Sequence, residues 1–217
     1  IKYLDNYSDY YSGHFNFFSF KNLNKITDIS FQNPKINLFK KKSQTYKVIS
    51  KLKFNELGIV EKSIEVNFNK REVFLRLNFK NVAPAILRLF NITLNPKNFD
   101  REKLYFSSNN GGKKLEKFEL LENFNHGSPV LEVSKYTSSN NSCTMTDGRF
   151  IIGDNKKKLI FNNNLEINPF VAMIEYKKLP KNFFLRASFS CREMDDTYKF
   201  SRINNLSAQI KIHAEKQ

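Results

Sequence analysis

Apolar and polar residues alternate one by one along most of this sequence. The stretch Val73–Phe79 reads VFLRLNF, with an apolar residue at every second position, and Ile64–Phe68 shows the same pattern shortly before it. Successive side chains of a β-strand point to opposite faces of a sheet, so this period is typical of strands with one face in a core. The polar residues that join the two stretches predict the turn of a β-hairpin.

Further runs of this kind follow along the chain, separated by glycine, proline and asparagine turn signals. They cover His14–Phe20, Ile29–Phe31, Tyr46–Phe54, Ala85–Leu94, Lys117–Leu121, Arg149–Ile152, Lys158–Phe161, Ala172–Tyr176, Phe183–Phe189 and Ala208–His213. About ten strands at this spacing predict an all-β fold, a large antiparallel β-sandwich or a barrel, and we favour the sandwich. Helix is scarce: Asp100–Leu104 predicts one helical turn.

The chain has 217 residues and shows neither an internal repeat nor a linker that would divide it. We therefore predict a single domain over residues 1–217. The sequence opens on Ile1 without a charged leader or a processing site, so we expect a mature chain or a part of a longer one. No stretch approaches the roughly 18 consecutive apolar residues of a membrane span.

The charge of the chain is strongly positive, with 36 lysines and arginines against 21 acidic residues and a formal net charge of +15. Such an excess of positive charge is typical of proteins that bind nucleic acid. The bases are scattered along the chain, however, and its abundant Lys, Asn, Ile, Phe and Tyr are what an AT-rich genome imposes. Specific binders concentrate their bases on one element, so we favour a solvated basic surface over nucleic-acid binding.

Metal, cofactor and nucleotide chemistry find little support. Cys143 and Cys191 belong to no C-x-x-C pair, and the glycine-rich phosphate loops are missing from the sequence. For the acidic cluster Glu193–Asp196 we favour a solvated loop over its rival, a calcium site. We predict no metal and no cofactor. A disulfide between the cysteines, or two buried thiols, both stay open.

The residues that we predict to bind a ligand lie in loops. Tyr11 and His14 end a tyrosine-rich segment, His126 precedes a glycine, and Asp147 and Asp154 flank Arg149–Ile152. Aromatic rings beside histidine and aspartate are suited to stack on sugars and bind their hydroxyls. The two aspartates also stand in Asp-Gly and Asp-Asn pairs, which predict hairpin turns. The roughly 15 Å strand between them is too long for a direct carboxylate pair.

Four stretches taken together carry a resemblance: Tyr11–Phe15, Arg88–Pro96, Thr146–Asp154 and Phe184–Ser190. They resemble the β-sandwich domain, of galactose-mutarotase-like type, that follows the catalytic barrel in family 57 and family 38 glycoside hydrolases. In those enzymes the nucleophile and the acid belong to the barrel. The resemblance therefore implies an accessory domain, and no catalytic residue is carried over to a position of this chain.

These observations predict a carbohydrate-active accessory or sugar-binding domain of a longer polypeptide that also holds a catalytic domain. One alternative is a free-standing mutarotase-like or lyase-like enzyme with His14 or His126 as the base, which needs hydrogen-bond reach to its substrate. Another is a structural or assembly domain whose basic surface meets an acidic partner.

Overall fold

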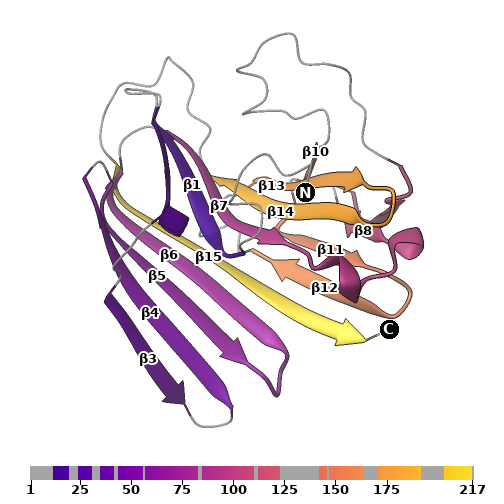
Figure 1. The fold of residues 1–217 in the computed structure, drawn as a ribbon, viewed down its shortest axis with the longest axis horizontal. Helices are drawn as coiled ribbons and strands as arrows, with labels where there is room; N and C mark the ends of the chain where they lie inside the picture. Colours follow the sequence, from indigo (N-terminus) through magenta and orange to yellow (C-terminus); the bar gives the residue numbers. More distant parts are fainter. Residues whose placement is uncertain are drawn as a thin grey trace.

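The computed structural model of the chain describes residues 12–19, 24–30, 35–41, 44–55, 57–82, 85–109, 112–122, 142–145, 147–163, 171–191 and 203–216. Its strands form two antiparallel sheets, shown in Figure 1. In spatial order, the small sheet holds β10 (Ser142–Met145), β13 (Val171–Lys178), β14 (Phe183–Cys191), β7 (Ala85–Thr93), β1 (His14–Ser19) and β2 (Lys25–Thr27). The large sheet holds β3 (Lys35–Lys41), β4 (Thr45–Phe54), β5 (Gly58–Asn67), β6 (Glu72–Val82), β15 (Ile203–Lys216), β12 (Lys157–Asn162), β11 (Arg149–Gly153), β8 (Tyr105–Ser108) and β9 (Glu116–Glu119).

Helical structure in the described residues is limited to short 3-10 turns: η2 (Asp28–Ser30), η3 (Pro96–Asn98) and η4 (Arg101–Lys103). The last of these confirms the helical turn predicted behind Asp100. The side chain of Asp100 caps it, because its carboxylate accepts a hydrogen bond from the backbone N–H of Glu102. The all-β class with little helix is confirmed.

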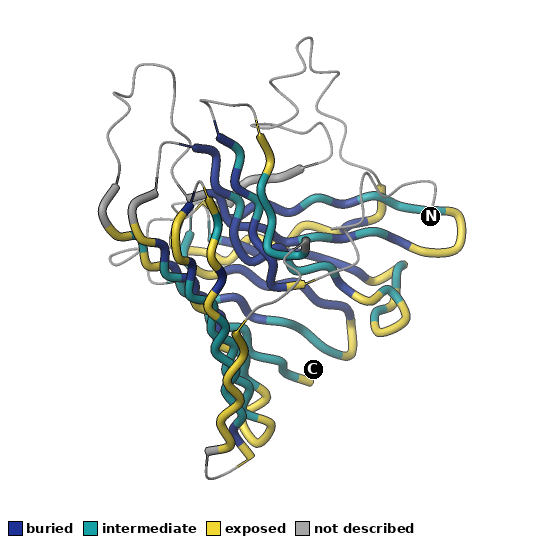
Figure 2. Tube along the Cα trace, turned by 60° about the vertical axis from the view of Figure 1, so that its left-hand side comes forward, coloured by how far each residue is buried: buried dark blue, intermediate teal, exposed yellow. Residues whose placement is uncertain are grey.

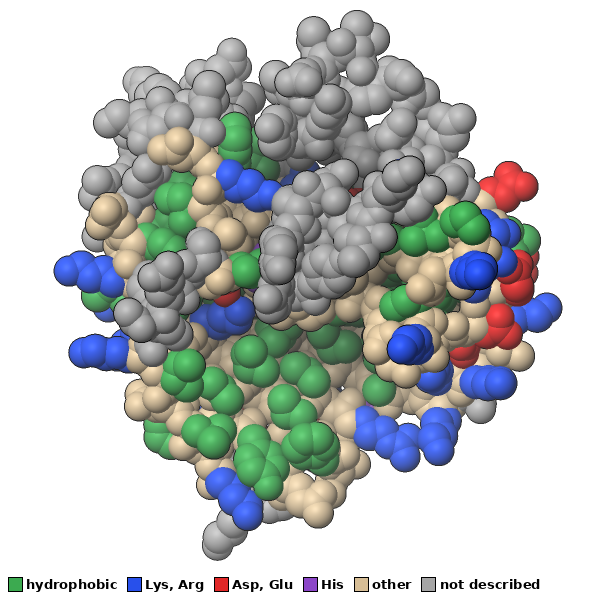
Figure 3. Space-filling model, in the orientation of Figure 1, with side chains coloured by type: hydrophobic (Ala, Val, Ile, Leu, Met, Phe, Trp, Pro, Cys, Tyr) green, Lys and Arg blue, Asp and Glu red, His purple; other side chains and the backbone are tan. Residues whose placement is uncertain are grey.

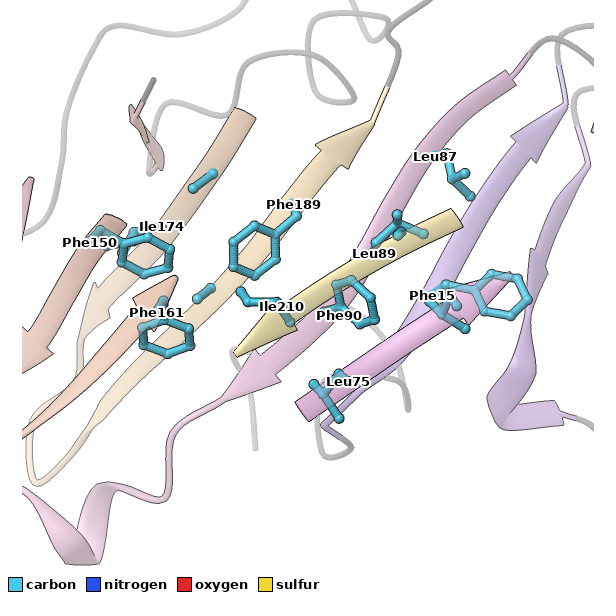
Figure 4. Packing of buried hydrophobic residues seen from close by; sticks show 14 of the residues in the cluster. Phe15, Leu75, Leu87, Leu89, Phe90, Phe150, Phe161, Ile174, Phe189 and Ile210 are labelled. Atoms are coloured by element: carbon cyan, nitrogen blue, oxygen red, sulfur yellow. The ribbon is translucent and has the colours of Figure 1, made fainter. Parts of the chain in front are cut away.

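The core lies between the two sheets, which makes the fold a β-sandwich (Figure 4). Phe150 and Phe161 of the large sheet stack with ring centroids 4.4 Å apart, and the ring of Phe189 from the small sheet lies 5.7 Å from that of Phe150. Phe15 of β1 meets Phe79 of β6 edge to face at 5.3 Å. Aromatic pairs of this kind bury much apolar area and bind one sheet to the other.

The predicted hairpin is confirmed as β5 and β6. Ile64 pairs with Leu75 and Val66 with Val73, so the apolar positions of both strands share one face of the large sheet. Burial follows the same alternation where the second sheet covers this face: Leu75 and Leu77 are buried, whereas Arg76 between them is exposed. The register is set by this apolar face, since a shift of one residue would turn it to solvent.

Two local predictions were wrong. Ile29–Phe31 does not form a strand within the described residues, because Asp28–Ser30 make the turn η2. Its Asp28 carboxylate accepts hydrogen bonds from the backbone N–H of Phe15 and from Lys62 Nζ, at 2.9 and 2.7 Å. Asp147-Gly148 does not close a hairpin either, because β10 before it pairs with β13 in the small sheet while β11 after it belongs to the large sheet.

The cysteine positions lie on strands that are not neighbours. Cys143 pairs with Ile174 on β13, and Ile174 pairs with Ala187 on β14, the strand that ends at Cys191. Neighbouring strands are about 4.8 Å apart, so β10 and β14 are separated by about 9.6 Å, beyond the roughly 7 Å that a disulfide tolerates between Cα atoms. This order of the described strands sets the two backbone positions farther apart than a disulfide allows.

One part of the large sheet extends beyond the small sheet. We call this part the arm; it consists of β3 and of residues 45–51, 61–67 and 72–76 of β4, β5 and β6. Figure 2 shows the arm mostly half-buried or exposed, whereas β8 and β11 of the large sheet, beneath the small sheet, are largely buried. The arm therefore presents both of its faces at the surface of the described structure.

Candidate functional site

An open groove of about 190 Å³ lies on the large sheet. It is lined by Lys47, Ser63, Glu65, Phe74, Leu75, Arg76 and Gln209. Phe74 and Arg76 alternate with the buried Leu75 and Leu77, so the groove opens on the outer face of the sheet, which is turned away from the small sheet.

Strand register brings the lining residues together in two adjacent rows. In the first row Lys47, Glu65 and Phe74 stand side by side on β4, β5 and β6. In the second row Ser63, Arg76 and Gln209 stand on β5, β6 and β15. Side chains paired directly across an antiparallel sheet lie about 5 Å apart, so each row forms a continuous band across the strands.

Phe74 supplies the apolar part of the groove. Its side chain lies on the polar face of β6 and is 42% exposed, which is high for a phenylalanine. Lys211 Nζ lies 5.5 Å from the centroid of the ring and 2.5 Å from the carboxylate of Glu72. These two contacts fix the ammonium group beside the ring. The rest of the ring surface stays accessible to a ligand.

The remaining side chains supply hydrogen-bonding groups. Arg76 Nη2 donates to Gln209 Oε1 at 3.0 Å, and this bond orients the amide group of Gln209. The lysine ammonium donates, the glutamate accepts, and the serine hydroxyl does both. An exposed aromatic ring bordered by such groups suits a small ligand with one apolar face and a polar edge.

The predicted binding residues do not meet in the described structure. Tyr11 and His126 lie outside the described residues. His14 is buried in β1, where it pairs with Asn91, whose side-chain Nδ2 donates to the backbone oxygen of His14. Asp147 is half-buried before β11 and Asp154 is buried after it, at opposite ends of the strand as expected. None of these three described residues lines the groove.

Asp154 organises the β11–β12 hairpin. Its Oδ1 accepts from the backbone N–H groups of Lys156 and Lys157 at 2.8 and 2.9 Å, and its Oδ2 accepts from the backbone N–H of Asp100 at 2.8 Å. Burial disfavours the charged carboxylate, but these three bonds outweigh it and hold the pKa of Asp154 below its ordinary value. These three hydrogen bonds to backbone donors explain the aspartate at this position by its role in stabilising the turn.

We expect Asp154→Asn to lower the free energy of unfolding by about 1 to 3 kcal/mol at neutral pH, because its amide group would face the N–H of Asp100 with a donor. The lowered pKa means that the unfolded chain takes up the proton first as the pH falls below about 4. The wild-type protein then loses this stabilisation as the pH falls through the folded pKa. Urea unfolding from pH 7 to pH 2 should show a shallower acid slope for the variant, and equal slopes would contradict this assignment.

The described residues contain no group of histidine, cysteine, aspartate and glutamate side chains arranged to hold a metal ion. His213 lies on the outer face of β15, with its Nε2 at 3.3 Å from a carboxylate oxygen of Glu215. The acidic cluster Glu193–Asp196 lies outside the described residues. None of the described helices is long and apolar enough to cross a membrane.

Comparisons with known proteins give a fold and no family. No family model and no curated protein matches the chain. Among solved structures, the family 36 α-galactosidase AgaA of Geobacillus stearothermophilus superimposes with a TM-score of 0.57 at 10% identity, over 94% of this chain and 30% of the enzyme. The α-galactosidase of Lactobacillus brevis gives 0.56 at 10% identity, over 93% of this chain and 29% of that protein. The fold resembles a part of these enzymes.

The galactosidase domain of the α-galactosidase–sucrose kinase AgaSK gives a TM-score of 0.52 at 9% identity and the same coverage, 93% of this chain and 29% of that one. The chain thus spans less than a third of the solved structures that it matches. The β-sandwich is one that glycoside hydrolases contain, as the sequence motifs suggested. These neighbours are α-galactosidases; AgaA is described as a family 36 enzyme, and none of the three is described as a family 57 or 38 enzyme.

Sequence reasoning missed the groove, although one signal was present. In Val73–Phe79 the apolar positions 73, 75, 77 and 79 face the core side of the sheet, and Phe74 breaks the polar phase between them. A large aromatic ring at a position where the alternation predicts a polar, solvent-facing residue indicates a contact surface. Its polar neighbours could be found only with the register of four strands.

Proposed function

We propose that this chain is a sugar-binding accessory β-sandwich of a larger glycoside hydrolase-like protein, and that the groove on the outer face of β4, β5, β6 and β15 is its sugar site. The observation that carries the proposal is the exposed ring of Phe74 beside the hydrogen-bonding side chains of Lys47, Glu65, Arg76 and Gln209. The C–H faces of a sugar ring pack on an aromatic ring while its hydroxyls take the polar groups.

The fold comparison supports the accessory role. The similar solved structures are α-galactosidases about three times as long as this chain, and one AgaA variant was solved with raffinose. Under this proposal the reaction belongs to another domain of the polypeptide and the present chain contributes binding. Galactose and raffinose are therefore the first ligands to test, with glucose and maltose for comparison.

We expect Phe74→Ala to weaken binding of the preferred sugar about 10- to 100-fold, because a central aromatic anchor commonly carries that share of the binding energy. Titration calorimetry of the purified chain measures the effect. Phe118→Ala is the matched control, since Phe118 is similarly exposed at 40% but lies on β9 at the other edge of the large sheet. Equal affinities of the two variants for the sugar would mean that the groove is not the sugar site.

The predicted loop residues remain a second part of the proposal. Tyr11 and His126, together with Asp147, are proposed to contact a sugar or the adjoining domain, and Tyr11→Ala with an intact fold tests this by the same titration.

The motif resemblance proposes families 57 and 38 for the complete protein, while the fold likeness favours an α-galactosidase. Hydrolysis of raffinose by the complete protein would favour an α-galactosidase. Sugar turnover by this chain alone, lost in His126→Ala, would instead support the free-standing enzyme.

A further inference from the structure

The arm has a second unusual surface, on the face opposite the groove. Cross-strand pairs join Leu38 to Val48, Val48 to Ile64, and Ile64 to Leu75, so four strands contribute to one apolar row. A parallel row joins Tyr46 of β4, Val66 of β5, Val73 of β6 and Ile212 of β15. We call these two rows, with Ile36 and Phe68 at their ends, the apolar face of the arm.

This apolar face continues the core of the sandwich beyond the small sheet. The register places it on the same side of the large sheet as the buried Leu75 and Leu77. Figure 3 shows apolar side chains gathered over the lower part of that side. Leu38 is 69% exposed and Ile36 and Phe68 are each 60% exposed, while the side chains between them are half-buried.

The two faces of the arm are sharply different in composition. On the outer face the same strands carry Lys47, Lys51, Glu61, Glu65 and Arg76. The apolar face carries two charged residues, Lys40 opposite Tyr46 at the edge strand and Lys62 opposite Leu77, whose ammonium group is bound by Asp28. Contiguous exposed apolar patches on a soluble domain mark contact surfaces, because leaving them in water is unfavourable.

The charges around the apolar face indicate what covers it. Exposed bases lie at its margin: Lys40 on the edge strand β3, where it pairs with Tyr46, and Lys70 and Arg71 in the turn beside Phe68. A second copy would bring the same bases together, and each copy has a net charge of +15. Lysines on an edge strand also oppose strand pairing between copies. A partner with carboxylates at these places would instead be complementary.

We propose that the apolar face of the arm docks a different protein domain, whose contact surface is apolar at the centre and acidic at the rim. The domain would complete the second layer that the small sheet provides for the rest of the large sheet, where packed sheets lie about 10 Å apart. This docking uses the face opposite the groove, so a sugar and the partner domain bind without competing. It does not depend on the groove binding a sugar.

The test compares two substitutions that add the same charge to adjacent residues of β3. Leu38→Lys places the charge in the apolar face, and Phe39→Lys places it on the opposite face, where Phe39 is 48% exposed. The probe is a synthetic amphipathic peptide with leucines on one face and glutamates on the other, and its counterpart carries lysines in place of the glutamates. Fluorescence anisotropy reports binding to the full chain at two salt concentrations.

We expect the glutamate peptide to bind the wild-type chain and Phe39→Lys alike, and Leu38→Lys at least about 10-fold more weakly. The lysine peptide should bind more weakly than the glutamate peptide, by a factor that shrinks with salt. Equal binding of the two peptides, or equal effects of the two substitutions, would overturn the proposal. So would self-association in sedimentation that Leu38→Lys abolishes, because a second copy would then be the occupant.

Discussion

Replacement of Phe161 by alanine is expected to lower the free energy of unfolding by about 3 to 5 kcal/mol. Phe161 is fully buried, its ring lies 4.4 Å from that of Phe150 at an interplanar angle of 4°, and Phe189 of the small sheet lies 6.5 Å away. The substitution removes a ring from the contact between the two sheets. It costs the transfer energy of the ring and leaves a cavity that the stacked neighbour cannot fill.

Urea denaturation followed by far-ultraviolet circular dichroism measures this loss. Phe39→Ala is the matched control, because Phe39 is 48% exposed on the edge strand and its removal should change stability by less than about 0.5 kcal/mol. A loss for Phe161→Ala as small as that of the control would mean that the two sheets do not share a packed core at this point.

The alternation in the sequence predicted strands well where one face of a strand is buried. β5 and β6 were found as a hairpin because the apolar residues of Ile64–Phe68 and Val73–Phe79, apart from Phe74, fall on the phase that faces the core side. β8 was missed because all four of its residues, Tyr105–Ser108, are buried, and a strand that is covered on both faces shows no alternation.

The sequence pattern was least informative where long-range contacts decide the structure. Lys35–Lys41 was not among the predicted strands, yet it forms β3 because it pairs along its whole length with β4. Ile29 has strand propensity, but the bonds of Asp28 to Phe15 and Lys62 hold the segment in a 3-10 turn. Propensity is a local quantity, and such contacts override it.

The candidate site was beyond local reasoning for a related reason. Glycine and aspartate mark turns, so Gly153-Asp154 was found as the turn of the β11–β12 hairpin. Gly153 is needed there, since a Cβ atom would lie 2.8 Å from the backbone oxygen of Lys157. The groove, in contrast, joins Lys47 to Gln209 through the pairing of four strands, and no local signal sets that register.

The second large effect is expected for Asp28→Ala, which should lower the free energy of unfolding by about 3 to 5 kcal/mol. Asp28 Oδ2 lies 2.7 Å from Lys62 Nζ, with the two side chains only 4% and 17% exposed. Removing the carboxylate leaves a nearly buried ammonium group without its partner and the N–H of Phe15 without its acceptor. The bond also joins η2 beside the small sheet to β5 of the large sheet, where the arm begins.

The double variant Asp28→Asn with Lys62→Met removes both charges. It therefore separates the stability lost with the ion pair from the cost of leaving the Lys62 ammonium group buried without a partner. The asparagine oxygen can still accept from the N–H of Phe15, and methionine keeps the apolar stem of the lysine, so most of the lost stability should return. Glu61→Ala is the control, because the Lys51–Glu61 pair at 3.9 Å is well exposed and worth little. If Asp28→Ala costs no more than Glu61→Ala in urea denaturation, water must reach the pair, and the pair does not help to hold η2 to β5.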